Sequence, residues 1–250
     1  MRVEAVFVGK SSVLKNPQNP LSTVESGIEK DVVEVLDVRK EGCEGDENVF
    51  EVHGGPDRAV LAFSTIDYAR AEQAFEKVFS APAWGENLLV NGLNEFNVTL
   101  GEVWAIGKDV KLQVTMPRKA CFKLGWKHDC PLLANWANSE ACGGWFLRCL
   151  TEGKVRPGDA VRVETKPFPT ISMAMLRWPS TLSQPLLVQL VGDDSPLGQE
   201  WKDSLAKHIQ PKPKPKPRSW CSKVAVNSLI GAFVASGIYA AFLLIQVIDA

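Results

Sequence analysis

The sequence predicts a mixed α+β fold that is mainly β, with a small helical appendage near the C-terminus and one transmembrane helix. Three observations lead to this prediction. Short runs that are valine-rich, or that alternate apolar and polar residues, recur between Gly/Pro turns, which is typical of a closed or half-closed β-barrel. Residues 199–209 carry apolar side chains at helical spacing. Residues 224–248 contain no charged residue.

The strands expected in the first 165 residues share valine-rich or alternating patterns: 2–8, 31–38, 49–52, 99–114 with a turn at 107–109, 143–150 and 160–164. A helix is expected over 64–79, where Ser64 and Asp67 resemble a capping box at the helix N-terminus. We interpret the apolar residues near one face of this helix as core packing: Ile66, Ala69, Ala74, Phe75 and Val78. A shorter helix is expected over 131–140.

Composition excludes some classes of protein. The formal net charge of −1 over 250 residues gives no reason to expect nucleic-acid binding. The six cysteines form no C-x-x-C pair, so the usual zinc, thioredoxin and iron–sulfur signatures are absent. The N-terminal residues lack the long apolar core of a signal peptide. Together these features favour a reducing, cytosolic setting with free thiols.

The stretch 115–124, TMPRKACFKL, is the strongest candidate for a chemical site. Pro117 is expected to end a strand because it cannot donate to a β-ladder. Cys121 follows, with Arg118, Lys119 and Lys123 close by in sequence. Nearby cations favour the thiolate, which is both a nucleophile and a soft metal ligand. The alternative is an ordinary buried cysteine in a basic turn.

A second candidate is HGGPDRAV, His53 to Val60. Its two glycines can bring backbone N–H groups close to a ligand, and Arg58 offers a planar guanidinium to a phosphate or carboxylate. The alternative is a tight turn with a surface arginine. Further on, Glu86 and Asn87 follow Gly85, where the backbone is expected to turn sharply.

The C-terminal part changes character after residue 165. Residues 166–210 are predicted to form a small helical region, with helices over 172–177 and 199–209. Residues 211–223 form a Pro/Lys-rich linker, and residues 224–248 are long enough to span a bilayer. Because basic residues precede this stretch, the sequence predicts a tail-anchored membrane protein with its large domain in the cytosol. The mitochondrial outer membrane, endoplasmic reticulum and peroxisome all fit the pattern.

Four segments taken together resemble the MOSC domain family, and most closely its YiiM-type members: HGGPDRAV, APAWGENLLVNGLNEFNVTLGE, TMPRKACFKL and GGWFLRCLTEGKVRPGDAV. The resemblance covers about residues 30–165 well and 166–210 more loosely. It implies a MOSC-type β-barrel over residues 1–165 that binds the molybdenum cofactor (Mo-molybdopterin). Residues 224–248 are not part of the YiiM pattern.

The resemblance also implies roles for individual residues. Cys121 matches the family cysteine that ligates molybdenum, although Ala120 stands where relatives often have proline. Arg58 and Arg118 are expected to bind the pterin phosphate, and Asn87 to bind the pterin or a metal-bound oxygen. His53 and Lys123 are further candidates for cofactor binding. Glu86 is expected either to donate a proton or to order its loop.

The activity that the resemblance implies is the two-electron reduction of N-hydroxylated bases or related compounds. The chain has no G-x-G-x-x-G motif, so electrons are expected from a separate donor protein, for example a cytochrome b5-type partner. Two alternatives remain open: a non-catalytic carrier of sulfur or molybdenum cofactor, and a membrane-tethered module for another phosphorylated ligand such as pyridoxal phosphate.

Overall fold

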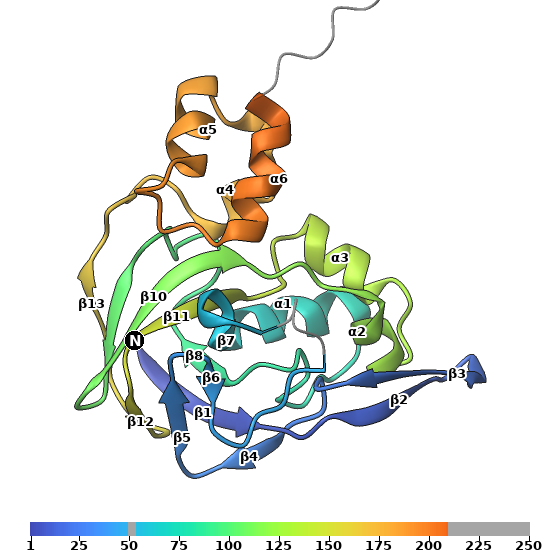
Figure 1. Ribbon diagram of the computed structural model, residues 1–250. Coiled ribbons are helices and arrows are strands. Elements are labelled where there is room, and N and C mark those ends of the chain that lie inside the picture. Colours follow the sequence, from blue (N-terminus) through green and yellow to red (C-terminus); the bar gives the residue numbers. More distant parts are fainter. Residues whose placement is uncertain (50–53, 210–250) are drawn as a thin grey trace, which may run out of the picture. The chain divides into compact units, whose positions relative to one another are not determined.

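An eight-stranded sheet forms the centre of the structure (Figure 1). The computed structural model describes residues 1–49 and 54–209. The strand order is β13 (Val161–Thr165), β9 (Val103–Ile106), β10 (Val110–Pro117), β11 (Trp145–Thr151), β7 (Val60–Ser64), β8 (Leu88–Asn91), β1 (Arg2–Val8) and β4 (Asp31–Val33). Neighbouring strands are antiparallel except β7 and β8, which are parallel and are joined through the helix α1 (Thr65–Phe75).

The prediction of a mixed, mainly β fold is confirmed, but the predicted barrel closure is not found. In the described part of the chain the sheet keeps two separate ends, β13 and β4. One isolated bridge, between Arg2 and Ala160, connects β1 to the segment before β13. Beside it, the Val3 N–H donates to the Asp159 carbonyl at 2.9 Å and the Gly158 N–H donates to the Val3 carbonyl at 2.8 Å. These contacts bring the segments together without forming a continuous ladder.

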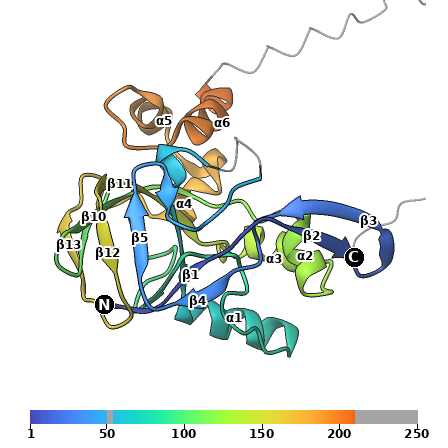
Figure 2. The same ribbon diagram turned by 60° about the horizontal axis from the view of Figure 1, so that its bottom comes forward.

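Two smaller sheets accompany the large one. β12 (Gly153–Val155), β5 (Leu36–Arg39) and β6 (Gly42–Cys43) form a three-stranded sheet. β2 (Ser12–Asn16) and β3 (Asn19–Ser26) form a hairpin that projects away from the other strands in both views (Figures 1 and 2). The predicted strand 31–38 is therefore two strands, β4 and β5, in two different sheets. Most of the predicted strand 49–52 lies outside the described residues.

The helix expected over 64–79 is α1, and it ends four residues earlier than predicted. Ser64 is its N-cap, and the Ser64 hydroxyl accepts a hydrogen bond from the Ile66 N–H at 3.0 Å. The helix stops after Phe75 because Glu76 adopts a left-handed conformation with φ 50°.

The predicted core face of this helix is wrong. Ile66 and Val78 are exposed, whereas the buried residues of α1 are Asp67, Tyr68 and Ala71. Two of the three buried side chains carry polar atoms, so a count of apolar residues does not favour the face that they form. The Tyr68 hydroxyl, for example, donates to the Glu86 carboxylate.

The remaining helices lie in two groups. α2 (Phe122–Lys127) and α3 (Leu133–Ser139) follow β10, and the region after β13 contains α4 (Met173–Leu176), the 3-10 turn η3 (Pro179–Thr181), α5 (Gln184–Val191) and α6 (Gln199–Ile209). Leu176, Leu190 and Leu205 of this region share one hydrophobic cluster with Val114 and Leu147 of the sheet. The helical region therefore packs onto the sheet. The division into a domain over 1–165 and a helical region over 166–210 stays a prediction.

The prediction of a tail-anchored membrane protein is not supported. Among residues 1–49 and 54–209, no helix has both the length and the apolar character needed to cross a bilayer. The longest helices there, α1 and α6, have 11 residues each, whereas a span needs about 20. The predicted linker, 211–223, and the predicted span, 224–248, lie outside the described residues. This finding contradicts the predicted membrane localisation, which we do not retain.

Candidate functional site

A cavity of about 220 Å³ brings together residues that are far apart in the sequence. It is lined by Ser26, Gly27, Ile28, Lys30, Asp46, Asn48, Val49, Arg58, Ala59, Leu61, Trp84, Gly85, Asn87, Met116, Pro117, Arg118, Lys119, Cys121, Lys123, Phe146, Glu200 and Trp201. Five of these side chains are cations and two are carboxylates, a formal balance of +3. Three aromatic rings complete the wall. The cavity thus favours a ligand with an anionic group.

Cys121 lies in the loop between β10 and α2. β10 ends at Pro117, as expected, and Cys121 is the N-cap residue of α2. Of the five cysteines that the structure describes, Cys121 is the exposed one; Cys43, Cys142 and Cys149 are buried. Burial raises the pKa of those three thiols, which keeps them protonated and unreactive. Cys121 is therefore not the ordinary buried cysteine considered as the alternative.

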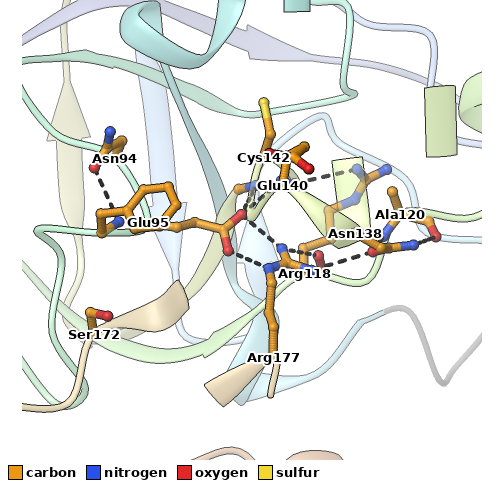
Figure 3. Close-up of polar contacts among 12 residues, drawn as sticks. Asn94, Glu95, Arg118, Ala120, Asn138, Glu140, Cys142, Ser172 and Arg177 are labelled. Carbon is orange, nitrogen blue, oxygen red and sulfur yellow. Dashed lines mark hydrogen bonds and ion pairs between the residues drawn. The ribbon is translucent and has the colours of Figure 1, made fainter. Parts of the chain in front are cut away.

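A buried ion pair supports the cysteine loop from behind (Figure 3). Glu95 is fully buried, and its Oε1 accepts hydrogen bonds from the N–H groups of Gly143 and Gly144 at 2.7 and 2.9 Å. Arg177, directly after α4, donates from Nε to Glu95 Oε2 at 2.5 Å and from Nη2 to Oε1 at 2.7 Å. Nη2 of Arg177 also donates to the Arg118 carbonyl at 2.8 Å. The ion pair thus holds the first residue of the loop.

Asn138 of α3 holds the same loop two residues further on (Figure 3). Its Oδ1 accepts from the Ala120 N–H at 2.9 Å, and its Nδ2 donates to the Ala120 carbonyl at 2.8 Å. Nη1 of Arg177 donates to the same Oδ1 at 3.3 Å. The backbone is therefore fixed at Arg118 and at Ala120, immediately before Cys121.

Arg58 reaches the cavity from the short 3-10 helix η2 (Pro56–Arg58). Its side chain is 13% exposed and forms an ion pair with Glu200 of α6. The Arg58 guanidinium carbon also lies 5.4 Å from the centre of the Phe146 ring. Burial lowers the pKa of Arg58, yet a guanidinium stays charged at neutral pH.

Arg118 differs from Arg58 in its partners. Its Nη1 donates to the Gly143 carbonyl at 3.4 Å, and within the described residues no carboxylate forms an ion pair with it. Burial lowers the pKa of this guanidinium, and the nearby Cys121 opposes that effect. A partly buried cation without a carboxylate partner is suited to an anionic ligand.

Asn87 lines the cavity, but its amide is already bonded to the protein. Oδ1 accepts from the Leu61 N–H at 3.0 Å, and Nδ2 donates to the Phe7 carbonyl at 3.3 Å and to Asp46 Oδ2 at 2.9 Å. Asp46 in turn pairs with Lys30, and both side chains are buried. This arrangement orders the wall of the cavity rather than leaving an amide free for a ligand.

The remaining predicted residues have varied positions. Lys123 lines the cavity, and its Nζ donates to the Glu25 carbonyl at 3.2 Å. Glu86 is fully buried and does not line the cavity; it accepts from the Tyr68 hydroxyl and from the Trp84 N–H. Burial raises the pKa of Glu86. These contacts fit the loop-ordering role. His53 lies outside the described residues.

Several residues at or behind the cavity have positions that the sequence did not assign to the site. Glu200 and Trp201 come from α6, a surface-type amphipathic helix, and Asn138 and Arg177 act from behind the loop. In the sequence Lys119 is one of several cations near Cys121; in the structure its Nζ lies 4.8 Å from the centre of the Trp201 ring. The ion pair between Arg58 and Glu200 cannot be predicted from the positions of the two residues in the sequence.

Comparison with known proteins places the chain among related sequences. Residues 50–162 match the MOSC domain family. The chain is 38% identical over 118 residues to Protein YiiM of Escherichia coli, 36% identical over 137 residues to the uncharacterized protein YflK of Bacillus subtilis, and 33% identical over 135 residues to a protein of Gibberella moniliformis named Reductase. These matches span 46%, 54% and 53% of this chain, but only 52%, 62% and 24% of the respective relatives.

Solved structures agree with the sequence matches. The crystal structure of YiiM from Geobacillus stearothermophilus superposes with a TM-score of 0.68 at 25% identity, covering 83% of this chain and 98% of that one. YiiM from Escherichia coli gives a TM-score of 0.65 at 23% identity, covering 84% of this chain and 92% of that one, and supports the same fold. The chain is therefore similar to the MOSC domain family over residues 50–162, and to YiiM in its fold.

Proposed function

We propose that this chain is a molybdenum-cofactor-binding reductase whose site is the cavity around Cys121. The observation that carries the proposal is the meeting of one exposed thiol with the guanidinium groups of Arg58 and Arg118 in a single cavity with an excess of positive charge. A thiolate can bind a soft metal centre, and two guanidinium groups can bind the phosphate of an organic ligand attached to that metal.

The residues present fit that cofactor. In the described part of the chain, no group of three or more His, Cys, Asp or Glu side chains could hold a bare metal ion. A metal bound at Cys121 must therefore bring most of its ligands with it, as molybdenum in a dithiolene does. Cys121 would bind the metal, Arg58 and Arg118 would bind the phosphate, and Lys123 would add positive charge. When bound, the cofactor supplies the two-electron redox chemistry.

The chain's own residues position and enclose the ligand. Arg177 and Asn138 fix the backbone that carries Arg118 and Cys121. Phe146 and Trp201 support the cations of the cavity, since Arg58 lies over the Phe146 ring and Lys119 lies over the Trp201 ring. In our proposal, Asn87 acts through Asp46 and the backbone, since its amide is bonded to both.

The substrates and partners belong to the proposal as well. One relative is named Reductase, and this chain covers only 24% of that protein. N-hydroxylated bases are the substrate class that the resemblance to YiiM-type proteins favours. The chain has no flavin or nicotinamide fingerprint in its sequence, so we propose a separate electron-donor protein, for which a cytochrome b5-type partner is a candidate.

The test is an elemental and pterin analysis of the purified full chain, followed by turnover of a hydroxylamino substrate with an artificial electron donor. We expect molybdenum, pterin and turnover, and we expect Cys121→Ala to abolish turnover and deplete the metal. Cys130→Ala is the matched control, because Cys130 is a half-buried cysteine that does not line the cavity. Metal without turnover would instead support a cofactor carrier, and a phosphorylated ligand without metal would support a module of the pyridoxal phosphate type.

A further inference from the structure

One of the two arginines in the cavity already holds an anion that belongs to the protein itself. Arg58 is paired with the carboxylate of Glu200. Arg118, in contrast, has no carboxylate partner among the described residues. A ligand with an anionic group would thus meet one available guanidinium and one that is occupied.

The two members of the Arg58–Glu200 pair differ in their freedom to move. The Arg58 side chain is 13% exposed, and its guanidinium rests on the Phe146 ring, whereas the Glu200 side chain is 49% exposed. Rotation of Glu200 into water requires no repacking, while displacement of Arg58 would uncover buried surface. If the pair separates, Glu200 is therefore the side that leaves.

The backbone that carries Glu200 is anchored, so the motion is confined to the side chain. The Gln199 N–H, at the start of α6, donates to Asp57 Oδ2 at 3.2 Å, and the Gly198 N–H donates to the Thr115 carbonyl at 3.3 Å. Gly198 lies so close to β10 that a Cβ there would meet Met116 Sδ at 2.8 Å. Trp201, the next residue along α6, is 4% exposed.

We propose that Glu200 is a built-in competitor for the anion site of this cavity, and that it selects for dianionic phosphate groups. A monoanion only replaces the charge that Glu200 already supplies to Arg58. A dianionic phosphate can pair with Arg58 and Arg118 together, and so displaces Glu200 at a net gain of charge–charge contacts. The inference rests on the proposed function only in assigning both arginines to an anion, and it requires no molybdenum.

Calorimetric titration of the full chain with inorganic phosphate at constant ionic strength tests this inference. Glu200→Gln keeps the size of the side chain and removes its charge. We expect this variant to bind phosphate about two- to fivefold more tightly than the unaltered chain, the range that corresponds to losing a partly exposed ion pair. A residue that only stabilised the site would change affinity in the opposite direction.

Two further variants make the test specific. Asp203→Asn removes one negative charge from the same helix, at an exposed residue that bonds Gln199 and does not line the cavity, and we expect no comparable gain. In an Arg58→Met background, Glu200→Gln should have no effect on phosphate affinity. Equal affinities for the unaltered chain and Glu200→Gln, an equal gain from Asp203→Asn, or no measurable phosphate binding by Glu200→Gln would each overturn the inference. Loss of molybdenum chemistry alone would instead count against the proposed function.

Discussion

Replacing Arg177 with methionine should destabilise the fold by about 3–5 kcal/mol, because it leaves the Glu95 carboxylate buried without its cation. The side chains of Arg177 and Glu95 are 4% and 0% exposed, so water cannot replace the lost partner without local opening. Arg177 makes four hydrogen bonds here, two to Glu95 and one each to Arg118 and Asn138. Two backbone N–H groups would still donate to Glu95. These hydrogen bonds limit the loss in free energy of unfolding.

Urea denaturation followed by tryptophan fluorescence measures this change. For a chain of this size, a loss of about 3–5 kcal/mol corresponds to a decrease in Tm of roughly 6–20 °C. Arg162→Met is the matched control: Arg162 is exposed on β13, and its replacement should change the free energy of unfolding by less than about 0.5 kcal/mol.

A double-mutant cycle shows whether the buried charge is the cause. Glu95→Gln in the Arg177→Met background removes the unpaired carboxylate and should recover about 1 kcal/mol or more relative to the simple sum of the two single changes. A loss below about 1 kcal/mol for Arg177→Met, or strict additivity in the cycle, would refute the reasoning.

Three other predictions test separate parts of the structure. In the native state, Cys121 should be alkylated by iodoacetamide well before Cys43, Cys142 and Cys149, as mass spectrometry of the modified peptides would show; equal rates would contradict the burial that separates them. Asn138→Ala should cost about 1–3 kcal/mol in urea denaturation by leaving the Ala120 N–H and carbonyl unpaired, and should alter the alkylation rate of Cys121; an unchanged rate would mean that the loop is held otherwise. Burial raises the pKa of Asp67 from 3.8 to about 6, so the folded state binds this proton more tightly than the unfolded state. The protonated Asp67 therefore contributes stability below about pH 4, and this contribution is lost as pH rises through about 6. Asp67→Asn should flatten that part of the stability–pH curve, and an unchanged slope would exclude Asp67 as its source.

Local patterns predicted the regular elements well where one face is buried. The alternation over 99–114 became the hairpin of β9 and β10, with Val110 opposite Ile106. The four-residue spacing in 199–209 became α6, with Trp201 and Leu205 buried. The same reasoning was wrong for the core face of α1, since the buried side chains there include Asp67 and Tyr68, whose inward direction depends on tertiary partners such as Glu86.

The candidate site shows a similar division. A single cysteine amid cations after a strand-ending proline predicted Cys121 and Arg118 as site residues, and a glycine turn predicted Arg58. All three line one cavity, and their roles stay predictions. The pairing of Arg58 with Glu200 depends on how α6 packs on the sheet. Gln199, at the start of α6, binds Asp57, which lies 142 residues earlier in the chain. No local pattern carries such information.

The match to the MOSC domain family ends before the last residues that contact the candidate site. The match ends at residue 162, whereas the arginine behind the cysteine loop, the carboxylate opposite Arg58 and the ring beside Lys119 stand at 177, 200 and 201. A protein truncated or recombined at residue 165 would retain Cys121 and both cavity arginines yet lose the three side chains that set how they are presented. A chimera built from two related proteins should therefore keep an intact site only when the segment through residue 209 and the β-rich region come from the same protein.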